Sequence, residues 1–194
     1  TLDSQLQKFV QENFFETVKG IREKANFPNP ELLNGSVIVV DTQTQEVLAM
    51  VGGLGKGEGD FLNRATRKYV IPGSSFKPLV LAAALHGNVI PSIDEKFHDI
   101  ETTFLVPGHD KEVLYTPQNF SKKWTGAHMK MYHALVYSKN GIFVQLNEKA
   151  ITKLGDDGMK NFFGQLGIDM PAYHLSSVLG VAETSLMDLA GVYM

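Results

Sequence analysis

The sequence predicts a mixed protein of helices and antiparallel strands, an α/β protein of the α+β kind, and two observations carry this prediction. Residues 36–40 and 47–51 are short runs rich in Val and Ile that flank polar residues 41–46, which is the pattern of an antiparallel hairpin. Residues 79–85 are apolar on every face and rich in strong helix formers, as expected of a buried helix. We therefore expect several helices together with an antiparallel hairpin.

The remaining elements follow from apolar spacing and from helix start and stop signals. Residues 1–25 repeat apolar side chains every three or four positions behind the capping candidates Thr1, Asp3 and Ser4, which predicts an amphipathic helix that ends before Pro28. Further helices are expected at residues 129–137, 142–154, from Asp156 or Asp157 to 166, and from Thr184 or Ser185 to 194.

The sequence predicts loops in two segments. Residues 52–59 are dense in glycine, but their spacing fits neither phosphate-binding pattern, so we expect a mobile loop. Residues 88–123 show no sustained period and are long for a loop, which is typical of functional or ligand-facing segments. Within this segment Glu95, Asp99 and Glu101 are expected to form a solvated charge cluster.

Length, charge and composition exclude several classes of function. The 194 residues suit a single domain over 1–194, and the net charge of −3 without a basic cluster argues against a nucleic-acid partner. The chain has no cysteine, no apolar run long enough to span a bilayer, and no histidine spacing typical of a helical metal site. We expect no cofactor and no metal. The absence of an initiator Met and of a final helix stop predicts a piece of a longer protein.

Ser74 and Lys77 form the strongest chemical signal. They lie three residues apart where Pro72 and Gly73 precede the buried helix, and Pro78 is tolerated only in a first turn. Positions i and i+3 share a helix face, so the lysine can reach the serine hydroxyl. A serine nucleophile needs a nearby base, and burial lowers the pKa of a lysine enough for that role. The alternative is an N-cap serine followed by a surface lysine.

Ser138 and Asn140 form the only S-x-N pattern, and it interrupts two predicted helices. This position can direct a hydroxyl and a carboxamide out of a helix junction. Serine and asparagine are also ordinary connectors, so the pattern alone is weak. It gains weight from the S-x-x-K upstream, because active-serine acyltransferases of the penicillin-recognising kind combine these two motifs with a K-T-G strand.

Taken together, the chain resembles the transpeptidase domain of class A (bifunctional) penicillin-binding proteins, in its N-terminal portion. The Gly-Gly after the second strand, the Asn-Arg-Ala-Thr run and the Ser-Ser-Phe-Lys-Pro run favour class A over class B. The matching runs occur in the expected order at residues 1–7, 35–41, 47–53, 63–66, 72–78, 116–119, 134–140 and 179–180. The resemblance implies the penicillin-binding protein/serine β-lactamase-like transpeptidase fold, in which helices surround an antiparallel sheet.

The resemblance also implies a D-alanyl-D-alanine transpeptidase that cross-links peptidoglycan stem peptides through an acyl-serine intermediate and that β-lactams inhibit. Ser74 would be the nucleophile and Lys77 its proton acceptor. Ser138 would relay a proton toward the leaving group, and Asn140 would hydrogen-bond Lys77 and the substrate amide. The Ser74 N–H would form half of the oxyanion hole.

One departure from the family pattern is large, because no K-T-G or K-S-G follows Ser138. The expected fold is therefore incomplete, and the chain alone is expected to be unstable and inactive without a second chain or segment that carries the K-T-G strand. Two alternatives stay open: a serine β-lactamase, for which no water-activating residue is evident, and a β-lactam-binding or structural fragment without turnover.

The implied partners are peptidoglycan stem peptides and β-lactams, with a glycosyltransferase domain and a membrane anchor elsewhere in the full protein. The implied location is the outer face of the bacterial cytoplasmic membrane.

Overall fold

The structure is a computed structural model that describes residues 3–24, 26, 28–55, 61–68 and 70–194. Its chain divides into two units, which are described separately here. The first comprises Thr1–Val70, Leu166–Ile168 and Glu183–Met194, and the second comprises Ile71–Gln165 and Asp169–Ala182. The single domain expected over residues 1–194 stays a prediction.

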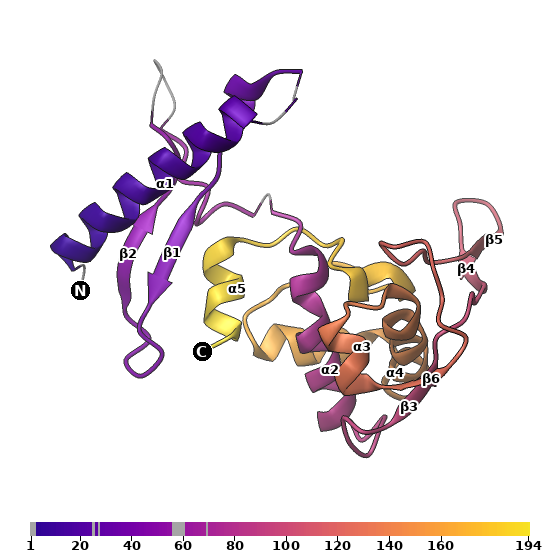
Figure 1. Ribbon diagram of the computed structural model, residues 1–194. Coiled ribbons are helices and arrows are strands. Elements are labelled where there is room, and N and C mark those ends of the chain that lie inside the picture. The colour runs from indigo at the N-terminus through magenta and orange to yellow at the C-terminus, as the bar shows by residue number, and fades with distance from the viewer. Residues whose placement is uncertain (1–2, 25, 27, 56–60, 69) are drawn as a thin grey trace. The chain divides into compact units, whose positions relative to one another are not determined.

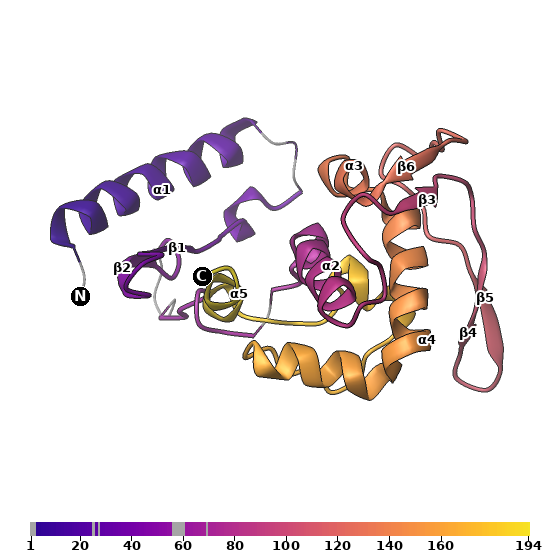
Figure 2. The ribbon, with the colours of Figure 1, turned by 90° about the horizontal axis from the view of Figure 1, so that it is seen from below.

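The first unit is built on the predicted hairpin. Strand β1 (Val37–Val40) pairs antiparallel with β2 (Val47–Val51), with Val37 opposite Val51 and a register shift between Val39 and Val40. Helix α1 (Ser4–Lys24) lies along the hairpin in both views of the ribbon (Figures 1 and 2), and a short 3-10 helix, η1 (Pro30–Leu32), follows it. The hairpin and the first helix are confirmed.

Helix α1 is attached to the hairpin by side chains and by hydrogen bonds. Phe14 and Val18 are buried in one cluster with Val51 and Leu54. At the start of the helix, the Gln7 carboxamide donates to the carbonyl of Met50 at 3.0 Å and accepts from its N–H at 2.8 Å. These bonds occupy backbone groups at the edge of β2, so this edge is covered by the helix. The Asp3 carboxylate accepts from the N–H groups of Gln5 and Leu6, which confirms one expected cap.

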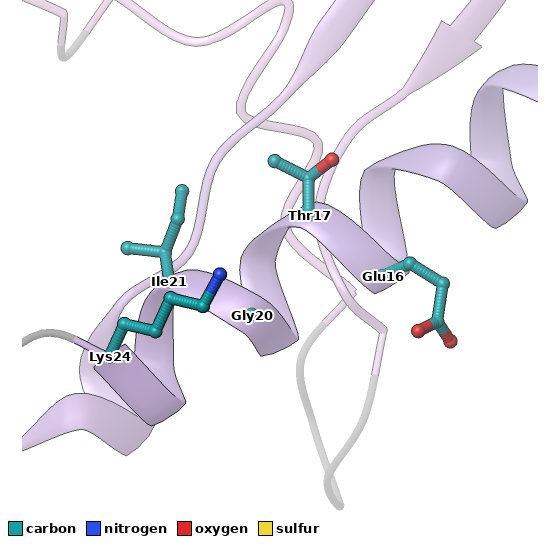
Figure 3. Close-up of a pocket in the computed structure, with 5 residues that line it drawn as sticks. All are labelled: Glu16, Thr17, Gly20, Ile21 and Lys24. Carbon is teal, nitrogen blue, oxygen red and sulfur yellow. The ribbon is translucent and has the colours of Figure 1, made fainter.

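The exposed side of α1 carries a shallow hollow of about 560 Å³ (Figure 3). Its lining residues all belong to this one helix: Glu16, Thr17, Gly20, Ile21 and Lys24. The hollow opens over Gly20, where an added Cβ would meet no atom within 4 Å. A depression over one helix lacks groups that converge from several elements, so we assign it no chemistry.

Helix α5 (Leu186–Val192) completes the first unit and packs on β1. The Ser185 hydroxyl accepts from the N–H of Asp188 at 2.9 Å, which confirms the cap expected at Thr184 or Ser185. The helix ends at Val192 rather than running to Met194 as expected. Part of the predicted glycine-rich loop, residues 56–60, lies outside the described residues, as does the capping candidate Thr1.

The second unit is mainly helical. The 3-10 helix η2 (Gly73–Phe76) leads into α2 (Lys77–His86), which packs against α4 (Asn140–Gln165) and the 3-10 helix η3 (Leu175–Leu179), as Figure 2 shows. Helix α2 is largely buried, as its sequence predicts, although Ala82 and His86 are exposed. Helix α3 (Met131–Val136) is shorter than the expected run 129–137 because residues 128–130 form a strand. Gly155 has a φ of 72° inside α4, so the chain breaks where the sequence places a helix end.

The prediction that residues 88–123 are irregular is wrong. Strand β3 (Lys96–His98) pairs antiparallel with β6 (His128–Lys130), and β4 (Phe104–Pro107) pairs with β5 (Glu112–Tyr115). Each strand has only three or four residues, too few for alternation of apolar and polar side chains to be recognised. The described pairs are all antiparallel, so the mixed helix and antiparallel-strand class is confirmed. None of the described helices combines the length and apolarity needed to cross a bilayer.

Candidate active site

Ser74 lies in the exposed turn η2, immediately before helix α2. Two glycines with left-handed backbones shape this turn: Gly73 has a φ of 57° and Gly180 a φ of 69°. The N–H of Gly73 donates to the carbonyl of Gly180 at 3.2 Å, and a Cβ on Gly180 would overlap the Gly73 backbone. Pro78 lies in the first turn of α2, as expected. The two backbones therefore touch directly at the base of the turn that carries Ser74.

Lys77 is fully buried, in contrast to Ser74. Its Nζ has three acceptors: the Ser138 carbonyl at 2.9 Å, the Ser138 Oγ at 3.0 Å and the Asn140 Oδ1 at 2.6 Å. The Phe143 ring lies 5.5 Å from the same nitrogen. Burial lowers the pKa of the Lys77 ammonium from 10.5 to about 8. A substantial fraction of this lysine is therefore neutral near pH 8, the state in which an amine accepts a proton.

Ser138 lies between Lys77 and Ser74. Its hydroxyl is 3.0 Å from the Ser74 Oγ and 3.0 Å from the Lys77 Nζ. Ser138 occupies the junction of α3 and α4 with a φ of 50°, a left-handed conformation that non-glycine residues seldom adopt. The Lys77 backbone N–H donates to the Ser74 carbonyl at the end of η2, but among the described residues no hydrogen bond joins the Lys77 Nζ directly to the Ser74 Oγ. Tertiary structure thus connects the S-x-x-K pair through the S-x-N serine.

Asn140 is the first residue of α4 and the fourth residue of the site. Its Oδ1 accepts from Lys77, and its Nδ2 donates to the carbonyl of Gln118 at 2.7 Å. The amide orientation follows from these partners, since a carboxamide offers one acceptor and one donor group. The four residues predicted from sequence, Ser74, Lys77, Ser138 and Asn140, are brought into one hydrogen-bonded chain.

A hollow of about 470 Å³ opens over this chain of hydrogen bonds. The aromatic rings of Phe120 and Tyr137 line it and are largely exposed. The remaining lining residues are polar: Ser74, Asn119, Ser121, Ser138, Lys139 and Asn140. An exposed hydroxyl at the floor, with a buried amine one hydroxyl away, can support acyl transfer to Ser74.

Sequence reasoning missed the residues that support this chain from behind. The interpretation of Asp99 as part of a solvated charge cluster is wrong, because Asp99 is fully buried and binds the Lys139 ammonium at 2.7 Å. Asn119 is also buried and donates to Asp99. A charged residue inside the S-x-N pattern signals a partner, but the partner lies 40 residues away in sequence. Only the fold identifies it.

No group of three or more metal-ligating side chains gathers in the described ranges.

A model of the penicillin-binding protein transpeptidase domain matches residues 35–178, a range that contains all four residues of the chain of hydrogen bonds. Among curated relatives, penicillin-binding protein 1A of Clostridium tetani is 32% identical over 100% of this chain and 25% of its own length. Penicillin-binding protein 1A of Neisseria lactamica is 30% identical over 84% of this chain and 19% of its own length. The chain thus spans a quarter or less of these relatives.

Solved structures agree in fold. The match to the crystal structure of penicillin-binding protein 1A from Haemophilus influenzae covers 82% of this chain and 23% of the Haemophilus chain, with a TM-score of 0.70 and 26% identity. PonA1 from Mycobacterium tuberculosis, solved in complex with penicillin V, covers 99% of this chain and 48% of that chain, with a TM-score of 0.68. At 20% identity the second likeness shows the fold alone.

Proposed function

This chain belongs to the family of penicillin-binding protein transpeptidase domains, as its resemblance to class A members predicts, and we propose that it catalyses D,D-transpeptidation through an acyl-Ser74 intermediate. The proposed donor is a peptidoglycan stem peptide that ends in D-alanyl-D-alanine. The proposed acceptor is an amine of a neighbouring stem peptide.

One observation carries the proposal: a buried lysine of lowered pKa lies one hydroxyl away from an exposed serine. A neutral amine has two N–H donors and one lone pair. The carbonyl of Ser138 and the Oδ1 of Asn140 suit the two donors, which leaves the lone pair toward the Ser138 hydroxyl. In the protonated state the third N–H donates to that same hydroxyl. The site therefore suits both protonation states without moving a heavy atom.

Acylation follows from this arrangement. The Ser74 Oγ attacks the carbonyl carbon of the penultimate D-Ala while its proton passes to the Ser138 Oγ, and the Ser138 proton passes to neutral Lys77. The C–N bond then breaks as the proton returns through Ser138 to the leaving D-Ala nitrogen. The acceptor amine attacks the acyl-Ser74 carbonyl and gives up a proton to Lys77 through Ser138. The C–O bond to Ser74 then breaks as that proton returns through Ser138 to the Ser74 Oγ, which leaves the new amide and the free hydroxyl. Hydroxyls suit this relay because they rotate between donor and acceptor roles.

The backbone at Ser74 supports charge development on the carbonyl oxygen. Among the described residues, the Ser74 N–H has no hydrogen-bond acceptor, and the hydroxyl beside it is exposed. A free N–H next to the nucleophile suits one half of an oxyanion hole, and removal of such a donor costs about 10²–10³ in rate in other acyl-transfer enzymes. The other half is proposed to come from a K-T-G segment outside these 194 residues.

β-Lactams are proposed to react as donor analogues that acylate Ser74 and leave slowly. Asn140 is proposed to hold the donor amide as well as Lys77. In the full protein a glycosyltransferase domain and a membrane anchor are proposed to accompany this chain, on the outer face of the bacterial cytoplasmic membrane.

Covalent labelling with a fluorescent penicillin tests the proposal in the full-length protein that carries this chain. We expect the parent to be labelled, the Ser74→Ala variant to be unlabelled, and the neighbouring Ser75→Ala variant to be labelled like the parent. Equal labelling of Ser74→Ala and the parent would reject the assignment. Release of D-Ala from a pentapeptide donor supports transpeptidation, whereas steady nitrocefin turnover favours a β-lactamase, and labelling without D-Ala release favours a binding protein.

A further inference from the structure

Asp99 is a buried carboxylate held in place from several sides. It follows strand β3, and its backbone N–H donates to the Ala127 carbonyl while its carbonyl accepts from the Gly126 N–H, both at 3.0 Å. Its side chain has no exposed surface. The backbone of Asp99 is therefore held in place independently of its side chain, because both of its backbone groups are hydrogen-bonded to the segment that leads into β6.

Three donors occupy the Asp99 carboxylate. The Lys139 Nζ lies 2.7 Å and the Thr125 N–H 3.0 Å from Oδ2, and the Asn119 Nδ2 lies 3.3 Å from Oδ1. Burial by itself would raise the pKa of Asp99, but the hydrogen bonds from Lys139 and Thr125 and the Lys139 charge outweigh it, so the pKa is lowered. Asp99 is therefore ionised at neutral pH, and its charge is compensated inside the protein.

Two of these donors lead to the residues on either side of Asn140. The first is direct, because Lys139 precedes Asn140 in the chain. The second runs through Asn119, whose Oδ1 accepts from the Gly141 N–H at 3.3 Å while its Nδ2 holds Asp99. The Asn140 side chain is held within the same segment, since its Nδ2 donates to the carbonyl of Gln118. Asp99 thus anchors the backbone before and after Asn140.

The close packing at Gly141 restricts the same stretch. A Cβ on Gly141 would come within 2.6 Å of the Trp124 ring, so the start of α4 lies directly against that side chain. On the other side, Ser138 keeps a left-handed backbone with a φ of 50°, which persists only when surrounding contacts hold it. Lys139, the next residue in the chain, forms an ion pair with the buried carboxylate of Asp99 and so holds the backbone directly beside Ser138.

We propose that Asp99 and Lys139 are positioning residues for acylation of Ser74: their buried ion pair, with Asn119, holds the S-x-N segment so that Ser138 and Asn140 face Lys77. This inference rests on the proposed function and extends it, since neither residue touches the reacting hydroxyl. The x position of S-x-N thereby gains a role, which is to connect the segment to a fixed carboxylate.

Lys139→Met tests this role, because it keeps the length of the side chain and removes the charge. The probe is a fluorescent penicillin at several concentrations, and the readouts are the limiting acylation rate constant and the half-saturating concentration. We expect Lys139→Met to lower the limiting rate constant by ~10–100-fold, the scale of a small misplacement of catalytic groups. The half-saturating concentration should change far less. Lys139→Arg keeps the charge and should recover most of the rate.

A matched control is Lys130→Met, which removes an exposed ion pair with Asp94 at 2.8 Å, outside the network that leads to Asn140. Its acylation rate should equal that of the parent. If Lys139→Met does not fold, the double variant Asp99→Asn/Lys139→Met, which removes both buried charges, takes its place and should also acylate slowly.

The outcomes separate the two proposals. Suppose that the parent is labelled on Ser74, and that the Lys139→Met and Lys139→Arg variants are acylated at the same rate as each other. The positioning role is then wrong, and the proposed function stands. The role is also wrong if Lys139→Met only reduces the amount of labelled protein while the folded fraction reacts at the parental rate constant. If the parent itself is not labelled on Ser74, the proposed function fails.

Discussion

The lowered pKa of Lys77 predicts how acylation depends on pH. If neutral Lys77 takes the proton that Ser74 loses, the rate follows the neutral fraction of this lysine. With a pKa of about 8, roughly 9% of Lys77 is neutral at pH 7, whereas a lysine of ordinary pKa 10.5 would be about 0.03% neutral. Burial thus increases the reactive population about 300-fold at pH 7. The second-order acylation rate should rise about tenfold per pH unit below pH 7 and level off above pH ~9.

The assay is stopped-flow or gel-based labelling with a penicillin between pH 6 and 10, corrected for hydrolysis of the probe at each pH. Circular dichroism at each pH serves as a control for folding. A rate that is constant between pH 6 and 9 would refute the role of Lys77 as proton acceptor. A rate that continues to rise tenfold per pH unit up to pH 10 would refute the statement that burial lowers the pKa of Lys77.

The lowered pKa of Lys77 also makes the stability of the fold depend on pH. The direction is opposite to that of a lysine in a salt bridge, whose pKa is raised in the folded state. The folded state gives up the Lys77 proton at about pH 8 and the unfolded state only at 10.5, so the unfolded state binds more protons between these values. The free energy of unfolding should therefore gain on the order of 3 kcal/mol as the pH rises from 8 to 10.5, and lose this gain as the pH falls through 8. Comparison with Lys77→Met isolates this contribution, because that variant lacks the titrating group.

Two further substitutions test the scaffold around the site. Gly180→Ala places a Cβ on the Gly73 backbone at a positive φ, so it should lower the melting temperature and slow acylation by displacing the turn that carries Ser74. Unchanged acylation would show that this contact does not set the turn. Tyr173→Phe removes the buried hydroxyl that lies 2.6 Å from the Asn147 Oδ1, which should cost about 1–3 kcal/mol in stability and leave acylation of folded protein unchanged. A variant as stable as the parent in urea unfolding would contradict that estimate.

Local signals in the sequence account for the elements that have a strong apolar period or clear start and stop residues. The hairpin, the first helix, the buried helix after Ser74 and the break at Gly155 were all predicted because each depends on residues close together in the chain. The strands β4 and β5 pair with each other across a short turn, but each has only four residues, too few for a recognisable alternation of apolar and polar side chains. Strand β3 escapes prediction for a further reason. A strand of three or four residues is stabilised by its partner, and for β3 that partner, β6, begins at His128.

The same division holds at the site. Local patterns identify the candidate side chains, because Ser74 and Lys77 lie on one turn and Ser138 and Asn140 on one helix junction. Tertiary structure decided how they connect: Lys77 is joined to Ser74 through Ser138, 61 residues away from the lysine. It also decided the state of Asp99, which has the sequence context of a surface charge and yet is buried against Lys139. Burial and long-range hydrogen bonds depend on what the rest of the chain places nearby, so neither can be read from neighbours in sequence.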